Sequence, residues 1–246
     1  MAATKGNVQA VVIDEFIFNS TVSEVGFSIA VDELECTNLA STAKEYIPNV
    51  DDPTVTVNGY LTGGAADGYE AEMNARKGVS GTNVLYIPLR TTTGSPVRVI
   101  PDASLMGLDY ASPINGLMTL NGTIRPTDAH YRGMLVTYNT TISGTGNGTS
   151  IDLGSAGSAG GYGYLHVHTI DGGKSGTATS ASFKIQSSAD DSSFADEGTF
   201  TVSATGAFSA TMSGTVNRYI RLNTADMGGA TSFTVTLIAC VSGVTY

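Results

Sequence analysis

The stretch "PTVTVNGYL", residues 53–61, alternates apolar and polar side chains along its length. Val55 and Val57 point to one side of the chain and the intervening threonines to the other, which is the period-two pattern of a half-buried β-strand. The same alternation occurs upstream in "EVGFSIAV", residues 24–31, and far downstream in "TSFTVTLIACV", residues 231–241. A pattern that recurs along the whole chain predicts a protein built mainly of β-sheet.

The composition favours strands and turns, and it favours a surface that is partly covered. Of the 246 residues, 30 are glycine, while Leu, Glu and Lys are sparse. Charged residues make up only 14% of the chain, below the roughly 25% of an average globular domain. So few charges suggest that part of the surface is shielded from solvent, and repeated assembly is one explanation.

The charge balance is acidic and argues against binding of nucleic acid. The net charge is −10 at pH 7, from 22 acidic and 12 basic residues. Residues 1–150 hold 15 acids and 8 bases (−7), and residues 151–246 hold the remaining 7 and 4 (−3). Binding through phosphates needs Lys and Arg, so this balance argues against such binding. It does not exclude nucleic acid that slides past an acidic wall.

One segment departs from the strand pattern. "DGYEAEMNARKG" runs from Asp67 to Gly78 and places Tyr69, Met73 and Arg76 on one helical face. The aspartate can cap the start of a helix, and the glycine can end it. The segment predicts one short helix.

A run rich in Gly, Ser and Ala divides the chain. Residues 143–161 have few core-forming side chains and predict a flexible linker. The linker separates a first β domain, residues 1–142, from a second, residues 162–246. The second part has several short alternating strands with Gly, Asp and Ser turns, which predicts a β-sandwich.

The search for reactive side chains predicts no catalytic site, no metal site and no cofactor. His166 and His168 share one strand face, but a third zinc ligand is not evident, and exposed sheet-face histidines are the simpler interpretation. No nucleophile elbow and no phosphate-binding loop is recognisable. The sequence therefore does not indicate an enzyme.

The acidic stretch "SSADDSSFADEG", residues 187–198, has two interpretations. Asp and Ser favour turns because their side chains bond the local backbone, so a hairpin connection is favoured. Calcium binding by Asp190, Asp191 and Asp196 is the alternative, although their spacing does not match an EF-hand loop.

Cysteine usage and the N-terminus indicate synthesis in a reducing cytosol. Cys36 and Cys240 lie far apart, which makes a disulfide framework unexpected. The N-terminal segment reaches acidic residues too early for a secretory signal. No stretch approaches the ~20 apolar residues of a membrane span.

The segment "EYIPNVDDPTVTVNGYL", residues 45–61, resembles the early region of the major tail tube proteins of long-tailed (siphovirus-type) bacteriophages. A short helix and "NVLYIPL" follow as in that family, and the later strands resemble a β-sandwich appended to many phage proteins. The resemblance implies a mainly β fold, with a tail-tube β-sandwich or barrel domain containing one short helix, followed by an Ig-like β-sandwich. The positions that match the family pattern are Pro48, Asp52, Thr54, Thr56 and Gly59.

The resemblance also implies a structural role in a virion. Subunits would form hexameric rings that stack into a tube, and the acidic lumen would conduct double-stranded DNA during ejection. Partners would be further copies of the chain, a tape measure protein and tail terminator or baseplate proteins, with no membrane. The second domain would decorate the tube exterior, after synthesis in the host bacterial cytoplasm.

Two segments are expected to contact neighbouring subunits under this interpretation. They are the loop from Leu39 to Asp52 and the predicted helix. The loop candidates are Lys44, Glu45, Tyr46, Ile47 and Pro48, and the helix candidates are Tyr69, Met73 and Arg76.

Two other structural roles remain open. A capsid decoration or tail-tip protein could carry the same sandwich without forming tubes. A receptor-binding protein would present aromatic side chains to carbohydrate, and Tyr162, Tyr164 and Tyr219 are candidates in a chain without tryptophan.

Overall fold

The structure, a computed structural model, describes most of the chain and divides it into two compact units. The described residues are 10–18, 22–36, 44, 46–61, 68–87, 90–158, 160–172 and 180–246. Unit 1 comprises Met1–Phe18, Asn83–Val99 and Tyr131–Tyr246, and unit 2 comprises Asn19–Thr82 and Ile100–His130. Within the described residues strands dominate and one α-helix occurs, which confirms the mainly β fold class.

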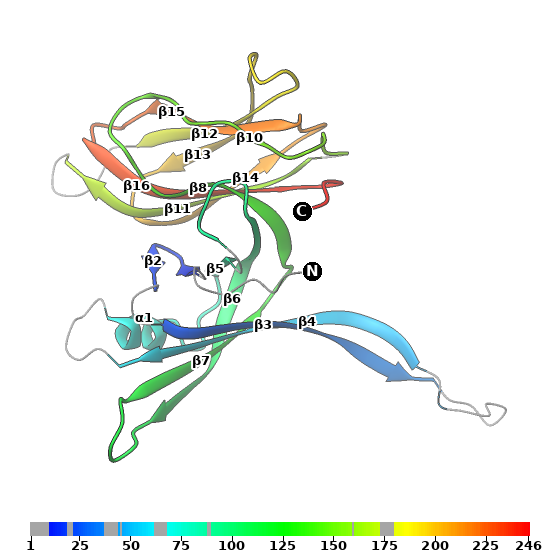
Figure 1. Cartoon of the computed structure of the whole chain (residues 1–246), viewed down its shortest axis with the longest axis vertical. Coiled ribbons are helices and arrows are strands. Elements are labelled where there is room, and N and C mark those ends of the chain that lie inside the picture. The colour runs from blue at the N-terminus through cyan, green and yellow to red at the C-terminus, as the bar shows by residue number, and fades with distance from the viewer. Residues whose placement is uncertain are drawn as a thin grey trace. The chain divides into compact units, whose positions relative to one another are not determined.

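Most of unit 1 is a two-layered antiparallel sandwich (Figure 1). One layer contains, in spatial order, β14 (Gly206–Met212), β11 (Gly161–Asp171), β16 (Ser232–Val241) and β8 (Tyr131–Ile142). The other layer contains β10 (Ile151–Asp152), β15 (Tyr219–Asp226), β12 (Ala181–Ser188) and β13 (Ala195–Val202), with β9 (Gly146–Asn147) also paired to β15.

Alternating apolar side chains from both layers fill the sandwich. Val167 of β11 and Ile185 of β12 are both fully buried. The rings of Phe183 and Phe233 meet edge to face with centroids 5.1 Å apart, an arrangement that aromatic pairs prefer. The period-two pattern of the sequence therefore translates directly into a core between two sheets.

The first layer continues into the remaining strands of unit 1. They are β6 (Pro96–Ala111), whose first residues pair with β8, then β5 (Thr82–Ile87), β1 (Ala10–Ile13) and β2 (Phe16–Ile17). A second apolar cluster lies on this part of the sheet and includes Val12, Leu85, Val99 and Ile238.

Unit 2 is a smaller antiparallel sheet with the helix packed against it. Its strands are β3 (Val22–Glu35), β4 (Tyr46–Tyr60), β7 (Thr119–Pro126) and the later part of β6, paired in that order. Helix α1 (Tyr69–Ala75) buries Tyr69 and Met73, and the strands contribute buried residues such as Val57, Leu120 and Ile124.

The helix is shorter than the segment expected for it. It begins after Gly68, which provides no side-chain cap, and ends at Ala75, whereas the expected cap Asp67 lies outside the described residues. Gly78 adopts a positive φ of 71° a few residues later.

Among the described residues, no helix is long and apolar enough to cross a membrane.

The two units do not follow the expected partition into residues 1–142, 143–161 and 162–246. Within the expected linker, Ile151 and Leu153 are 7% and 4% exposed and belong to the sandwich core. Strand β10 in that segment pairs with β15, and β8, expected in the first domain, pairs with β16. Composition alone could not reveal these pairings, because two apolar side chains suffice to anchor a glycine-rich segment on a sheet.

Candidate functional site

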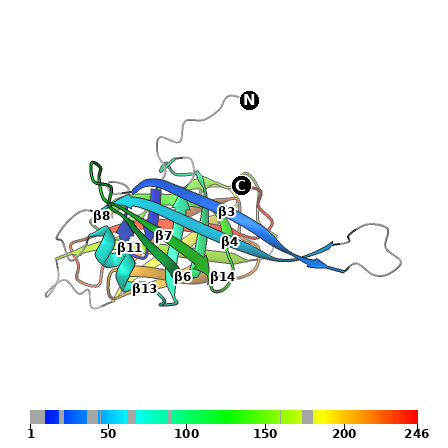
Figure 2. The same cartoon turned by 90° about the horizontal axis from the view of Figure 1, so that it is seen from below.

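The most extended feature of unit 2 is the ribbon formed by β3 and β4. The two strands pair from Val22 and Gly59 at one end to Glu35 and Tyr46 at the other. Strand β7 covers β4 only along Val55–Tyr60. We call residues 28–35 and 46–54 the distal ribbon; within the described residues it has no third strand (Figure 2).

One face of the ribbon is apolar from the core of unit 2 out into the distal ribbon. Val25 and Val57 lie opposite each other and are buried. Four and six residues further along β3 on the same face, Ile29 and Val31 are 39% and 45% exposed. Apolar side chains beside open strand edges are the usual elements of a pairing surface.

Charged groups on the ribbon form exposed pairs that contribute little stability. An Arg125 guanidinium nitrogen lies 3.0 Å from a carboxylate oxygen of Asp52, with both side chains substantially exposed. The Lys44 amine lies 3.0 Å from a Glu35 carboxylate oxygen across the ribbon end. Solvent-exposed pairs of this kind are each worth about 0–1 kcal/mol, so the ribbon is held by its backbone ladder.

The expected loop from Leu39 to Asp52 is a strand from Tyr46 onward. Lys44 is exposed, and Glu45 lies outside the described residues. The main chains of Tyr46, Ile47 and Pro48 belong to β4, but nothing is described of their side chains. The segment thus extends the ribbon by pairing with β3.

The helix candidates prove to be mainly internal. Tyr69 and Met73 are each 1% exposed, which removes both side chains from any surface of unit 2. The Tyr69 hydroxyl donates to the Val57 carbonyl at 2.9 Å, and its burial raises the pKa of the phenol. Met73 fills the space left beside Gly122, where a Cβ would collide with it.

Arg76 is the third helix candidate, and it is bound to its own helix. Its guanidinium Nη1 lies 2.5 Å from a Glu72 carboxylate oxygen, with both side chains largely buried. Sequence reasoning grouped Tyr69, Met73 and Arg76 on one helical face, and the first two form the face that attaches the helix to the sheet.

The two histidines of β11 share a face as predicted, but they are not exposed. His166 is fully buried, and its Nδ1 lies 2.7 Å from the Asp14 carbonyl oxygen. His168 Nδ1 lies 2.6 Å from the Glu15 carbonyl oxygen, and its Nε2 lies 2.8 Å from the Thr236 hydroxyl. Burial is the main cause that lowers the pKa of both rings.

These histidines hold a turn through contacts with its main-chain carbonyl oxygens. Over the parts of the chain that the structure describes, no group of three His, Cys, Asp or Glu side chains could hold a metal ion. A structural zinc site needs four such ligands. The role of the pair is therefore to hold the connection between β1 and β2 against β11.

The acidic stretch of residues 187–198 contains the hairpin turn between β12 and β13, as predicted. An Asp190 carboxylate oxygen accepts hydrogen bonds from the backbone N–H of Ser192 at 3.0 Å and of Ser193 at 2.9 Å. It also accepts the Ser188 hydroxyl at 2.8 Å. These bonds hold the pKa of Asp190 well below its usual range and fix its carboxylate on the turn.

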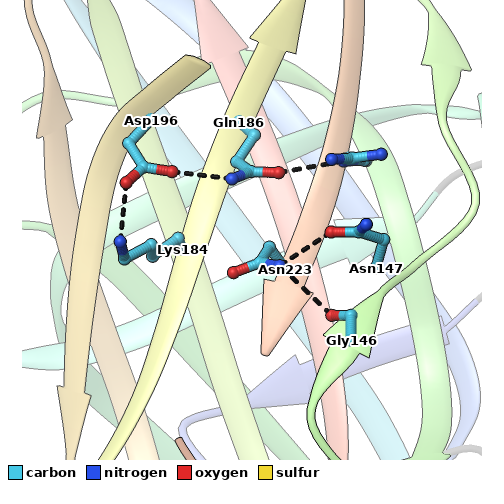
Figure 3. A network of polar contacts seen from close by, with 7 residues as sticks. Gly146, Asn147, Lys184, Gln186, Asp196 and Asn223 are labelled. Atoms are coloured by element: carbon cyan, nitrogen blue, oxygen red, sulfur yellow. Dashed lines mark hydrogen bonds and ion pairs between the residues drawn. The ribbon is translucent and has the colours of Figure 1, made fainter. Parts of the chain in front are cut away.

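The outward face of the second sandwich layer carries two sets of polar contacts, one around Gln186 and one around Asn223 (Figure 3). Asp196 accepts hydrogen bonds from Lys184 at 2.6 Å and from Gln186 at 2.7 Å. The Gln186 carbonyl accepts from Arg221 Nε at 2.9 Å, and the Asn223 amide donates to the Asn147 side chain at 2.7 Å. Groups that satisfy each other across strands stabilise the sheet and leave no reactive pair.

Sequence reasoning selected three tyrosines for carbohydrate contact, and the structure separates them. Tyr162 and Tyr164 cluster with Tyr131, with ring centroids 5.1 to 6.3 Å apart. Tyr219 lies in the other layer, where the Arg218 guanidinium stacks 5.2 Å from its ring centroid. The sequence did not point to Tyr131, because Tyr162 and Tyr164, which lie beside it, belong to the later strand β11.

Comparisons with known proteins give distant similarities. No family model matches the chain, and no curated protein matches it. A chain in the virion of the native gene transfer agent particle shares 13% identity, covers 56% of this chain and all of its own, and has a TM-score of 0.38. A chain of the anti-feeding prophage baseplate, solved with six-fold symmetry, shares 8% identity over 53% of this chain and 96% of its own, with a TM-score of 0.38.

A third structure aligns over a longer span. The Dit protein of phage SPP1, described as a hub of the adsorption apparatus, shares 10% identity over 95% of this chain and 98% of its own, with a TM-score of 0.36. Superpositions this loose do not carry the architecture or the function of those proteins over to this chain.

Proposed function

We propose that this chain is a structural protein of a phage tail whose copies assemble through the distal ribbon. The observation that carries the proposal is the apolar side of β3, which runs from buried Val25 to exposed Ile29 and Val31, with Asp51 of β4 opposite Val31. In a free subunit this face and the strand edges beside it contact water. A second copy that docks there buries the apolar side chains and pairs the open backbone groups.

The residues that resemble the tail tube family lie on the same ribbon. Pro48, Asp52, Thr54, Thr56 and Gly59 all belong to β4. The finer proposal is therefore a major tail tube protein, in which six ribbons form a ring and rings stack into a tube. Closure of such a ring removes the exposed strand edges.

The proposed lumen would conduct double-stranded DNA without binding it. Four exposed or half-exposed acids whose side chains are described lie on the distal ribbon: Glu33, Glu35, Asp51 and Asp52. Carboxylates on a tube wall repel phosphates, which keeps the DNA moving. A tape measure protein and terminator or baseplate proteins would be the partners at the tube ends, and the sandwich of unit 1 would decorate the outside.

Negative-stain electron microscopy of the concentrated, aged protein tests the proposal. We expect hollow tubes or six-fold rings, and we expect their loss in the variant Ile29→Asp/Val31→Asp. The matched control is Val79→Asp, a 52% exposed valine of unit 2 outside the ribbon, which should still assemble. Tubes that form equally well with the ribbon variant would refute the ribbon as the interface.

The alternative role as a capsid decoration or tail-tip protein makes a different prediction in the same experiment. It predicts monodisperse monomers or trimers at every concentration, also after addition of a tape measure protein. That outcome would overturn the tube proposal.

A further inference from the structure

We propose that a pocket at one end of the sandwich, lined by Tyr131 and Tyr162, binds a pyranose saccharide. The pocket has a volume of about 450 Å³, within the range of small-molecule sites. All of its lining residues belong to unit 1, so the proposal is independent of the proposed tail assembly. We call it the tyrosine pocket.

The pocket forms where four neighbouring strands end. Strands β8 and β11 begin there with Tyr131 and Gly161, and β14 and β16 end there with Met212 and Val241. Because these strands are adjacent and antiparallel, their four ends meet at one edge of the sheet. Side chains far apart in the sequence thereby converge on one hollow.

The aromatic wall is pre-arranged and accessible. Tyr162 is 38% exposed, and its ring centroid lies 5.1 Å from that of Tyr131. Both rings pack against Tyr164, which is only 3% exposed and lies 6.2 and 6.3 Å from them. A supported ring loses little conformational freedom on binding, and its face offers dispersion contacts to the C–H face of a sugar ring.

The polar wall supplies donors for sugar oxygens. Arg132 lines the pocket, and its guanidinium donates one hydrogen bond to the Tyr246 carbonyl at 2.7 Å. Guanidinium has five N–H donors, so this bond uses only one of them. Thr211 also lines the pocket, and no lining residue is acidic. The donors that remain on Arg132 favour a saccharide with a carboxylate over a neutral one.

The remaining wall is main chain that tolerates no added side chain. A Cβ on Gly161 would lie 2.3 Å from the Cys240 carbonyl oxygen, and one on Gly160 would lie 2.5 Å from that of Met212. The Cys240 thiol is buried, which raises its pKa and makes it unreactive. This wall of the pocket is therefore closely packed, and its buried thiol is not an activated nucleophile.

A second hollow of unit 1 is a weaker candidate. It measures about 550 Å³ and is lined by threonines such as Thr137, Thr140 and Thr141 beside Val136 and Leu222. Hydroxyls of this group already bond to one another or to Thr234. It has neither an aromatic ring nor a charged side chain among its lining residues, so nothing there selects a ligand.

Saturation-transfer NMR with the full chain tests the tyrosine pocket, with trigalacturonic acid as the acidic probe and maltotriose as the neutral probe. We expect the acidic probe to bind with a Kd of about 1 mM or tighter. Tyr162→Leu should weaken that binding at least tenfold, and Arg132→Gln should reduce the preference for the acidic probe. Tyr219→Leu, a tyrosine of the other layer, is the matched control and should bind as the unaltered chain does.

Each outcome decides the proposal. Binding of either probe that Tyr162→Leu removes supports the pocket, and the ratio between the probes tells whether a carboxylate is recognised. Absence of binding for both probes at concentrations well above about 1 mM overturns the proposal, as does binding that Tyr162→Leu leaves unchanged. Unchanged thermal unfolding of each variant ensures that a loss of binding is not a loss of fold.

Discussion

The imidazole Nδ1 of His166 lies 2.7 Å from the main-chain carbonyl oxygen of Asp14, 152 positions away in the sequence. A carbonyl only accepts, so this nitrogen carries the ring proton. The other ring nitrogen, Nε2, is buried and has no hydrogen-bond partner among the described residues. The contact holds a turn in which Asp14 adopts a φ of 51°, a conformation that few non-glycine residues adopt.

The histidine contact predicts a loss of stability in acid. Burial lowers the pKa of His166 to about 4, whereas an unfolded histidine titrates near 6.5. Between these values the unfolded chain binds more protons, so stability rises with pH across this window and is lost as pH falls through it. The full effect is on the order of 3 kcal/mol, measurable by urea unfolding at a series of pH values.

A conservative variant separates titration from packing. His166→Asn keeps a donor for the Asp14 carbonyl and removes the titrating ring, so it should flatten the pH dependence between about pH 4 and 6.5. His130→Gln, in unit 2, is the control and should retain the slope. An unchanged slope in His166→Asn would assign the acid sensitivity to other groups.

The buried hydroxyl of Tyr69 predicts a measurable hydrogen-bond contribution. It donates to the Val57 carbonyl at 2.9 Å inside the core of unit 2. Tyr69→Phe leaves that carbonyl without this donor and should lower the free energy of unfolding by about 1 kcal/mol. Tyr60→Phe, at a 42% exposed tyrosine, should change it little. Equal effects in the two variants would show that the hydrogen bond contributes nothing.

The glycine-rich segment, expected to be a linker, contributes to the sandwich core. Truncation of a buried side chain there should therefore destabilise unit 1. Leu153 is 4% exposed within the sandwich core. Leu153→Ala should lower the stability of unit 1 by about 2–3 kcal/mol through the lost apolar contacts and the cavity left behind. Ser155→Ala, at an exposed position of the same segment, is the control. A neutral result for Leu153→Ala in thermal unfolding would restore the linker interpretation.

Removal of the Asp190 carboxylate should loosen its turn locally, and calcium should not alter the protection of that turn. Its carboxylate accepts the backbone N–H groups of Ser192 and Ser193. Asp190→Ala should therefore speed amide hydrogen exchange at both serines, while Asp191→Asn should not, because Asn tolerates the φ of 59° found there. Protection that increases on addition of calcium would instead support the cation-binding interpretation.

Local patterns in the sequence determined the kind of element at most positions. Alternation at residues 24–31, 53–61 and 231–241 predicted strands that the structure contains. The 3.6-residue pattern around Tyr69 and Met73 predicted the helix, and the Asp and Ser run predicted the hairpin turn. These features follow from side-chain periodicity and turn chemistry, which act over a few residues.

The tertiary structure alone decided which segments share a core and which side chains line a surface. β8 belongs with β16 because of pairings such as Ile142 with Phe233, and the pocket partner of Tyr162 is Tyr131. The same holds for the burial of His166, since a period-two pattern tells which residues share a face but not what covers that face. Sheet pairing joins backbone groups that every residue carries, so the partner of a strand is selected by the packing of the whole chain and not by its own sequence.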